Sequence, residues 1–268
     1  MGYRMLSLAH CFGYVDVARL ETMAERVTDL KQRFLQHLAI QSGQRVLDVG
    51  CGPATDTIEM GHAVGKEGWV IGVDHDHEMV QRAEERIRFA GYGGWTRHIT
   101  ADAYNLPFRS DTFDCCHCER LLQHVDDGAK ILSEMVRVTV PGGRLAVADT
   151  DWASLSIDSP DIEIERRVTG GIAKLIRNGV AGRQLFRLFT EQGLVDLDLS
   201  VHPIVWTDWP TFRQTSFAIA NLDEHLAAAG LVSAEQWEQF LTSLEAANAR
   251  GCFFATGNLV LVVGTKPK

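Results

Sequence analysis

Two glycines and two carboxylates in the first third of the chain have the types and order needed to bind a nucleotide-like cofactor. Gly50 and Gly52 follow the short apolar run 45–49 and come directly before a helix-compatible stretch. Because glycine has no side chain, it lets a ligand approach the backbone closely at the N-terminus of that helix. Asp74 ends the next apolar run, where a carboxylate can accept hydrogen bonds from both hydroxyls of a ribose. Asp48, inside the first run, suits the positively charged amine of an amino-acid-like cofactor.

These residues must be positioned by strands and helices, and the hydrophobic pattern predicts both in alternation. Strands are expected at the apolar runs 45–50, 69–74, 113–118 and 144–149. Polar, helix-compatible stretches separate them at 54–64, 76–90 and 126–138. Strands that alternate with helices favour a parallel sheet covered by helices on both faces. Later in the chain, helices are expected at 161–177, 181–192 and within 222–250, and strands at 194–201 and 258–267.

The pattern shows no internal repeat and no low-complexity linker, so we expect a single elaborated domain over residues 1–268. An amphipathic helix is expected at 17–40, because apolar residues recur there at helical spacing. The expected parts are an N-terminal helical cap at 1–42, a cofactor-binding core at 43–151, helical substrate-side insertions at 152–192 and 201–257, and the last strands at 193–200 and 258–266.

Composition narrows the class of partner. The 26 basic and 35 acidic residues give a formal net charge of −9, which disfavours a general nucleic-acid binder because phosphate contacts need clustered Lys and Arg. No apolar run is long enough to span a membrane. We therefore expect a cytoplasmic protein with a small-molecule partner and neither a nucleic-acid nor a membrane partner. A homodimer stays open as an alternative to a monomer.

Four segments carry a resemblance to a known family. "VLDVGCGPATDT", "VIGVDHDHEMVQRA", "ADAYNLPFRSDTFD" and "ILSEMVRVTVPGGRLAVAD" occur in this order within residues 43–151. Together they resemble the class I S-adenosylmethionine-dependent methyltransferases, in particular the small-molecule branch that includes the quinone-biosynthesis C-methyltransferases. The resemblance implies an α/β fold: a doubly wound, mostly parallel, seven-stranded Rossmann-like sheet with helices on both faces and a helical cap or insertion. It also implies S-adenosyl-L-methionine as cofactor and methyl transfer to O, N or C of a small molecule.

The resemblance further implies roles for residues of the core. One departure from many relatives is Ala54, which stands where they have a further glycine. Asp48, Gly50 and Gly52 would line the methionine part of the cofactor, and Asp74 would hold the ribose hydroxyls. His75, Met79, Asp102 and Ala103 would lie around the adenine, and Glu119 and Arg120 would lie against the reactive end.

The acceptor side is less defined. His124 lies a few residues past the expected strand at 113–118 and is the best candidate for a catalytic base, although a structural role in that loop is an equal alternative. Asp149, Asp151 and Trp152 lie at the end of the expected strand at 144–149 or just past it, and they are expected to face the same mouth. Tyr14, with the N-terminal helix, is expected to cover the cofactor from the other side.

Two other functions compete with methyl transfer. A nicotinamide-dependent oxidoreductase would normally carry a third glycine, but Thr55 stands at that position, and the chain has no catalytic Tyr-x-x-x-Lys pair. A non-catalytic cofactor-binding protein on the same fold would bind the cofactor without turnover. Methylation of nucleic acid is disfavoured by the net charge and by the absence of an Asn/Asp-Pro-Pro-Tyr/Phe motif.

The stretch "FDCCHC" at 113–118 raises the question of a metal site. Successive side chains of a strand point to opposite faces, so Cys115 and His117 should face away from Cys116 and Cys118. Four neighbours on one strand cannot surround a zinc ion tetrahedrally. We therefore expect no metal here and interpret the thiols as small apolar side chains. Cys51 and Cys118 are expected near the cofactor, where a thiol would be a point of oxidation sensitivity.

Overall fold

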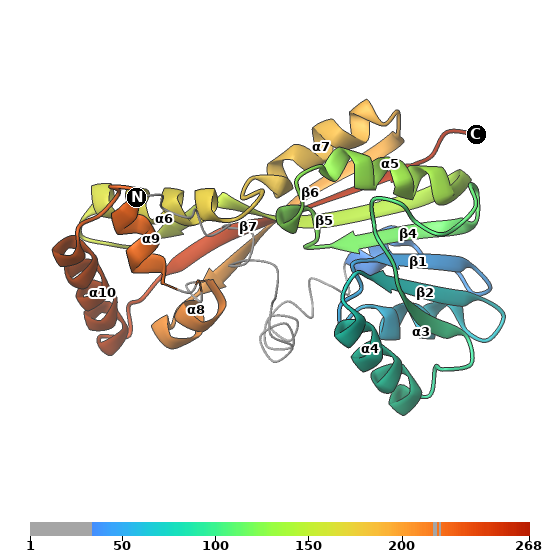
Figure 1. Cartoon of the computed structure of the whole chain (residues 1–268), viewed down its shortest axis with the longest axis horizontal. Helices are drawn as coiled ribbons and strands as arrows, with labels where there is room; N and C mark the ends of the chain where they lie inside the picture. Colours follow the sequence, from blue (N-terminus) through green and yellow to red (C-terminus); the bar gives the residue numbers. More distant parts are fainter. Residues whose placement is uncertain (1–33, 217–218, 220) are drawn as a thin grey trace, which may run out of the picture.

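The computed structural model describes residues 34–216, 219 and 221–268, and this part of the chain forms a seven-stranded sheet (Figure 1). The strand order is β3-β2-β1-β4-β5-β7-β6, and β7 is antiparallel to both of its neighbours. All other pairs are parallel, which confirms the predicted mostly parallel, Rossmann-like α/β sheet. The strands are β1 (Arg45–Val49), β2 (Trp69–Asp74), β3 (Thr96–Thr100), β4 (Phe113–Glu119), β5 (Thr139–Ile157), β6 (Val195–Trp206) and β7 (Ala255–Thr265).

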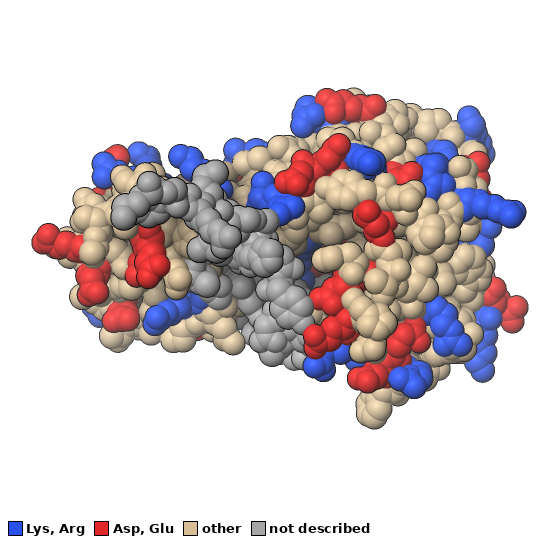
Figure 2. All heavy atoms as spheres, viewed as in Figure 1, with Lys and Arg blue, Asp and Glu red and all other residues tan. Residues whose placement is uncertain are grey.

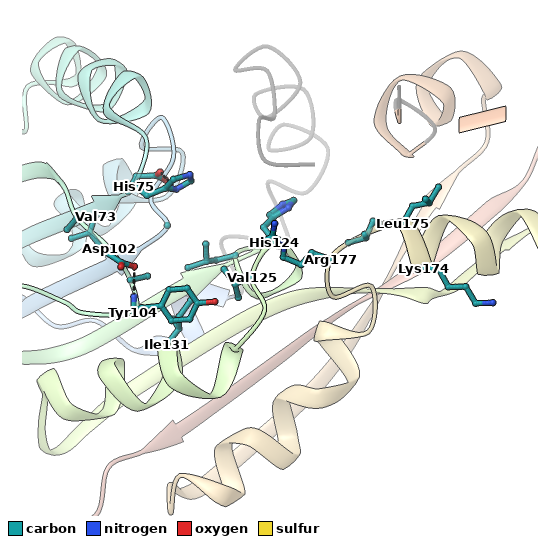
Figure 3. Close-up of a pocket in the computed structure, with 16 residues that line it drawn as sticks. Val73, His75, Asp102, Tyr104, His124, Val125, Ile131, Lys174, Leu175 and Arg177 are labelled. Carbon is teal, nitrogen blue, oxygen red and sulfur yellow. Dashed lines mark hydrogen bonds and ion pairs between the residues drawn. The ribbon is translucent and has the colours of Figure 1, made fainter. Parts of the chain in front are cut away.

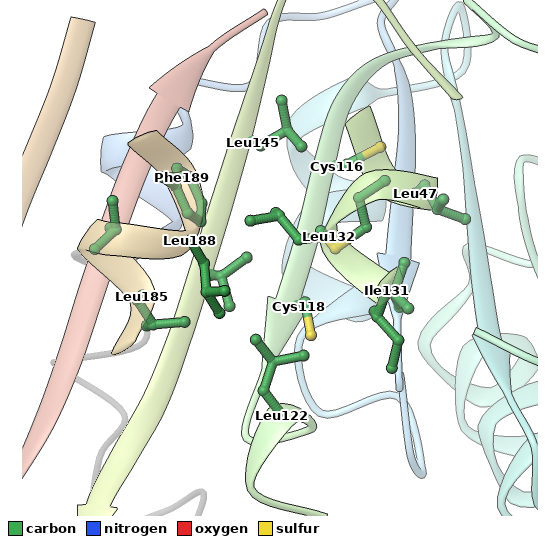
Figure 4. Packing of buried hydrophobic residues seen from close by; sticks show 14 of the residues in the cluster. Leu47, Cys116, Cys118, Leu122, Ile131, Leu132, Leu145, Leu185, Leu188 and Phe189 are labelled. Carbon is green, nitrogen blue, oxygen red and sulfur yellow. The ribbon is translucent and has the colours of Figure 1, made fainter. Parts of the chain in front are cut away.

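Helices cover both faces of this sheet. On one face, Leu132 of α5 packs with Leu185 and Phe189 of α7 against Leu47 and Cys116 of the strands (Figure 4). On the other face, α3 and α4 pack against the first strands. The helices are α3 (Thr57–Val64), α4 (His77–Ala90), the short 3₁₀ helix η2 (Leu122–His124), α5 (Gly128–Val138), α6 (Ile162–Leu175), α7 (Ala181–Glu191), α8 (Trp209–Ser216), α9 (Leu222–Ala228) and α10 (Ala234–Ala249).

Local sequence fixes the ends of the helices nearest the site. Asp76 caps α4 because its side chain accepts a hydrogen bond from the backbone N–H of Glu78 at 2.8 Å. The helix ends at Gly91, whose φ of +86° is the left-handed conformation that glycine adopts without strain. Asp127 caps α5 in the same way, through the N–H of Lys130 at 3.0 Å. The loops between strands and helices are therefore held at defined positions.

Three strands leave the core and form part of a second lobe. β5, β6 and β7 contain 19, 12 and 11 residues, and their far ends lie among α6, α8, α9 and α10 (Figure 1). We call these strand ends and four helices the helical lobe. Its hydrophobic core is separate from that of the sheet and contains Trp206, Phe212, Phe240 and Phe253. Acidic and basic side chains are interspersed over the face of the molecule seen in Figure 2.

Several predicted boundaries are wrong around this lobe. The fifth strand was expected to end at residue 149, but β5 continues to Ile157, where it still pairs with Ala255. It continues because Leu155 and Ile157 are buried while Ser156 between them is exposed, which is a strand alternation. Strand residues occupy both ends of the expected helical insertion at 201–257, whereas α8, α9 and α10 lie inside it as expected. Tyr14 and most of the expected helix at 17–40 lie outside the described residues.

Within the described residues, no helix has both the length and the apolar character that crossing a bilayer requires.

Candidate functional site

A cavity of about 640 Å³ lies at the ends of β1, β2 and β4 (Figure 3). β1 pairs with β2 on one side and with β4 on the other, so the strand order reverses here. Ligands of doubly wound sheets bind at this switch point, outside the carboxyl ends of the strands. The cavity is lined by Gly50, Val73, Asp74, His75, Ala101, Asp102, Ala103, Tyr104, Leu121, His124, Val125, Ile131, Lys174, Leu175, Ile176 and Arg177.

The glycine loop after β1 forms one wall of the cavity. Gly50 has a φ of +76°, and a Cβ atom at this position would lie 3.2 Å from the side chain of Leu121. Its N–H donates to the carbonyl of Val73 at 2.8 Å, which joins the loop to β2. Gly52 also has a positive φ, of +50°, and so does the buried Ala54, with +65°. Ala54 therefore has a left-handed backbone conformation that favours glycine, which is the residue that the family resemblance leads us to expect at this position.

The neighbours of Asp74 keep its carboxylate ionised and able to accept hydrogen bonds. Its carboxylate accepts from the N–H of Gly52 at 2.9 Å and from the N–H of Asp76 at 3.0 Å, and it pairs with His75 Nδ1 at 3.3 Å. Burial alone would raise the pKa of Asp74, but the hydrogen bonds from His75, Asp76 and Gly52 outweigh it and lower the pKa. The same bond to Asp74 raises the pKa of His75. The carboxylate thus stays charged at neutral pH.

Three of the four residues expected around an adenine line the cavity. His75 follows β2, and Asp102 and Ala103 follow β3. The Asp102 carboxylate accepts a hydrogen bond from the N–H of Tyr104 at 2.9 Å, which fixes its orientation. Met79 is only 5% exposed in α4 and is not among the lining residues. It packs as an ordinary apolar side chain instead.

A buried charged network that includes Asp48 and Glu119 lies beside the glycine loop. The residues expected at the cofactor that are not among those lining the cavity are Asp48, Gly52, Glu119 and Arg120. Asp48 Oδ1 is 2.9 Å from His117 Nδ1, and both side chains are buried. Burial lowers the pKa of His117, but the hydrogen bond that its Nδ1–H donates to Asp48 and the surrounding negative charges raise it overall. Glu119 pairs with Arg120 at 2.9 Å.

A cluster that could hold a cation occurs in this network, and it shares only His117 with the stretch 113–118 for which the sequence raised a metal site. Asp56, His117 and Glu119 each offer one potential ligand atom, and these atoms lie within 4.8 Å of one another. The strand alternation predicted for 113–118 is confirmed, since Cys116 and Cys118 lie in the core beneath α5 and α7, on the face away from Cys115. The histidine of "FDCCHC" therefore joins carboxylates rather than thiols.

Most thiols in the described part of the chain are shielded from solvent. Cys51, Cys115, Cys116 and Cys118 are buried, and Cys252 is exposed. Burial raises the pKa of Cys115 to about 11 and that of Cys116 to about 12. The pKa values of Cys51 and Cys118 are also raised, first by burial and then by nearby carboxylates. Because the thiolate is the reactive form, we expect these buried groups to react slowly with alkylating reagents.

The residues expected at the mouth after β5 occupy other places. Asp149 is 0% exposed, and burial raises its pKa to about 7 despite hydrogen bonds from three backbone N–H groups. Asp151 forms an ion pair with Arg183 at 2.9 Å. Neither lines the cavity, because β5 does not end at Asp149 and its side chains there lie against the loop and α7. Trp152 is half-buried and donates its indole N–H to Gln123.

Gln123 is a residue that the sequence did not single out. It is 5% exposed and stands directly before His124, which does line the cavity. Its N–H donates to Asp149 at 3.2 Å, its side-chain amide donates to the carbonyl of Arg120 at 3.2 Å, and its own carbonyl accepts from Asn178 at 3.0 Å. Gln123 therefore joins the end of β4, the middle of β5 and the loop after α6.

The end of α6 and the loop after it were also missed as part of the site. Lys174, Leu175, Ile176 and Arg177 line the far end of the cavity (Figure 3). No pattern in the sequence connects these residues to the glycine loop, because they reach the cavity only through the packing of the helical lobe against the sheet.

The glycine turn, the ionised carboxylate of Asp74 and the cavity at the carboxyl ends of parallel strands are typical of proteins that bind a nucleoside-containing cofactor. Residues 40–193, more than half of the chain, match the family model described as "Methyltransferase domain". The chain therefore belongs to the methyltransferase domain family, as the motifs predicted, and S-adenosylmethionine is its methyl donor.

Individual proteins resemble the chain over different shares of its length. An uncharacterized 37.1 kDa protein in transposon TN4556 of Streptomyces fradiae is 35% identical over 257 residues, which cover 92% of this chain and 70% of that protein. The demethylmenaquinone methyltransferase of Geobacillus kaustophilus is 34% identical over 125 residues, so the match covers 47% of this chain and about half, 53%, of the enzyme. The geranyl diphosphate C-methyltransferase of Streptomyces coelicolor, solved with S-adenosyl-L-homocysteine, has a TM-score of 0.57 at 16% identity, covering 89% of this chain and 79% of that one.

Proposed function

We propose that the protein transfers the methyl group of S-adenosylmethionine to a small-molecule acceptor held between the sheet and the helical lobe. The observation that carries this proposal is the shape of the cavity. It begins at Asp74 and Gly50, passes His124 and ends at Arg177, so one space joins a nucleoside-type site to a second compartment. Its volume of about 640 Å³ is within the range of pockets that enclose small ligands.

The residues at the first end fit the donor. We assign the ribose hydroxyls to the ionised Asp74 and the adenine to His75, Asp102 and Ala103, because a carboxylate can accept from its exocyclic amine. The methionine part is assigned to the glycine loop, where Gly50 lines the cavity and a Cβ atom would lie 3.2 Å from the side chain of Leu121. Asp48, Glu119 and Arg120, which lie behind that loop, supply its electrostatic environment rather than direct contacts.

S-adenosylmethionine supplies a methyl group on a positively charged sulfur, and a lone pair of the acceptor takes it while both electrons of the broken carbon–sulfur bond stay on sulfur. The chain's contribution is to hold the acceptor and exclude water, and positioning of this kind accounts for several kcal/mol of barrier. Leu121, Val125 and Ile176 form apolar walls around the reacting centre. We assign to His124 the removal of a proton from an acceptor hydroxyl or ammonium.

The test is isothermal titration of the purified protein with S-adenosylhomocysteine and, separately, with NAD. We expect S-adenosylhomocysteine to bind and NAD not to bind. The variant D74N should weaken S-adenosylhomocysteine about tenfold or more, because a hydrogen bond to a charged acceptor contributes about 1.5–3 kcal/mol. E85Q changes an exposed carboxylate in α4, the helix that follows Asp74. It is the matched control and should bind S-adenosylhomocysteine like the wild type. Binding of NAD alone would overturn the proposal.

A further inference from the structure

The cavity carries opposite charges at its two ends. Asp74 and Asp102 are the acidic lining residues, and both lie at the end assigned to the donor. The described residues that line the cavity from His124 onward include the cations Lys174 and Arg177, and none of these described residues is a carboxylate. The remaining surface of this half is apolar and includes Leu175 and Ile176. We call this half the acceptor compartment.

Arg177 is the cation best placed to meet a ligand there. Figure 3 shows it beside His124, whereas the ammonium of Lys174 points away from both residues. The Arg177 side chain is 36% exposed, and its Nη1 atom lies 3.2 Å from Oδ2 of Asp126, whose side chain is 79% exposed. An ion pair with a carboxylate so open to water contributes about 0–1 kcal/mol. A ligand can therefore replace Asp126 as the partner of Arg177 at little cost.

The backbone that carries Arg177 is fixed, so the charge is held at a constant place. The N–H of Asn178 donates to the carbonyl of Gln123 at 3.0 Å. The side-chain amide of Asn178 donates to Gln184 at 3.0 Å, and its carbonyl accepts from the N–H of Ala181 at 3.1 Å. Since Gln123 is the neighbour of His124, the same contacts set Arg177 relative to the candidate base.

The chemistry of this compartment selects an anion with an apolar body. A guanidinium presents parallel N–H groups that match the two oxygens of a carboxylate. A phosphate dianion would call for a second cation, and Lys174 is turned away. The walls formed by Leu175 and Ile176 favour an apolar ligand body over a charged one.

Resting on the proposed methyl transfer, we propose that the acceptor is a small amphipathic carboxylate. Its carboxylate binds Arg177 in place of Asp126, its apolar body lies along Leu175 and Ile176, and its nucleophilic atom is directed past His124 toward the donor. Arg177 is then a residue that determines acceptor specificity without touching the donor.

The test uses matched pairs of acceptors that share a body and a nucleophile and differ only in charge. The pairs are 4-hydroxybenzoate with 4-hydroxybenzamide, 4-hydroxycinnamate with its amide, and anthranilate with anthranilamide. Each compound is titrated into the full-length protein saturated with S-adenosylhomocysteine, and turnover is followed with S-adenosylmethionine as release of S-adenosylhomocysteine. We expect at least one carboxylate to bind ten times more tightly than its amide and to be the better acceptor.

The variants identify the cause of that preference. R177Q should reduce it to less than about twofold and R177K should keep part of it, because lysine retains the charge but not the fork. R166Q, at an exposed arginine of α6 that is 70% exposed and pairs with Glu163, is the matched control and should keep the full preference. Both R177 variants should bind S-adenosylhomocysteine and melt like wild type.

Three outcomes would overturn the inference: an amide that binds as well as its acid in every pair, an undiminished preference in R177Q, or no binding of any carboxylate. These outcomes leave the proposed methyl transfer standing as long as S-adenosylhomocysteine binds. Loss of S-adenosylhomocysteine binding by the wild type would instead refute the proposed function itself.

Discussion

Replacing Asp149 by asparagine should make the free energy of unfolding less dependent on pH. In the folded chain burial raises the pKa of this carboxyl to about 7, whereas an aspartate in an unfolded chain has a pKa of about 3.9. The folded state therefore holds the proton more tightly than the unfolded state. The resulting stabilisation is complete below pH ~4 and is lost as the pH rises through about 7.

The size of the effect follows from these two values. A separation of about three pKa units corresponds to about 4 kcal/mol over the whole titration. Between pH 5 and pH 8, which the folded protein can be expected to tolerate, the linkage relation gives a loss of about 2.5 kcal/mol. Asparagine cannot ionise, so D149N lacks this loss, although its amide meets the backbone N–H groups of Gln123 and Thr150 less well than a carboxylate does.

The measurement is urea denaturation of both proteins at half-unit steps from pH 5 to pH 8. We expect the wild type to lose about 2.5 kcal/mol relative to D149N over this range, and D158N, at an exposed carboxyl, to follow the wild type. A difference between wild type and D149N that stays constant within about 0.5 kcal/mol would refute the assignment of a raised pKa to Asp149.

Three further results are expected. G50A should weaken the binding of S-adenosylhomocysteine about tenfold, because alanine avoids a left-handed φ by about 1–2 kcal/mol, so the free loop relaxes and binding must restore its conformation. G94A, at a glycine with nothing within 4 Å, should bind like wild type in the same titration. Q123L should lower the free energy of unfolding by about 1–3 kcal/mol, since it leaves buried polar partners unsatisfied, and an unchanged urea midpoint would contradict this. Iodoacetamide should modify Cys252 in the native protein but not Cys118, with or without S-adenosylhomocysteine, as read by peptide mass mapping; labelling of Cys118 would show that the core opens.

The parts of the fold that the sequence predicted well are those that depend on local pattern. β1, β2 and β4 begin and end within one residue of the expected runs, because each is a short apolar segment closed by a polar residue or glycine. The resemblance to methyltransferases covers the same region, and the family model confirms it. Asp74 could be singled out for the same reason: its place at the end of a strand follows from the pattern alone.

The residues that could not be predicted depend on what the chain does far from them. Asp149 was expected at the mouth because the apolar run ends there, yet the weaker alternation that follows it keeps the strand going and buries the carboxyl. Gln123 has no distinctive sequence context, and its hydrogen bonds to Arg120, Asp149 and Asn178 exist only once three segments have packed together. The same holds for Arg177, which comes from a different lobe.

The residues that we propose to place the acceptor come together at the junction of the two lobes. β5 and β7 pair without interruption from Arg144 to Asp151 and pair again, after a register shift, at Ser156 and Ile157, so the sheet and the helical lobe share continuous strands. The loop that contains His124 is hydrogen-bonded through Gln123 to Asp149 in the part of β5 that belongs to the sheet. The loop that contains Arg177 follows α6 of the helical lobe. Because the lobes have separate hydrophobic cores, substitutions inside the helical lobe can reshape the acceptor compartment while the donor site stays unchanged, provided that the contacts at the junction are kept.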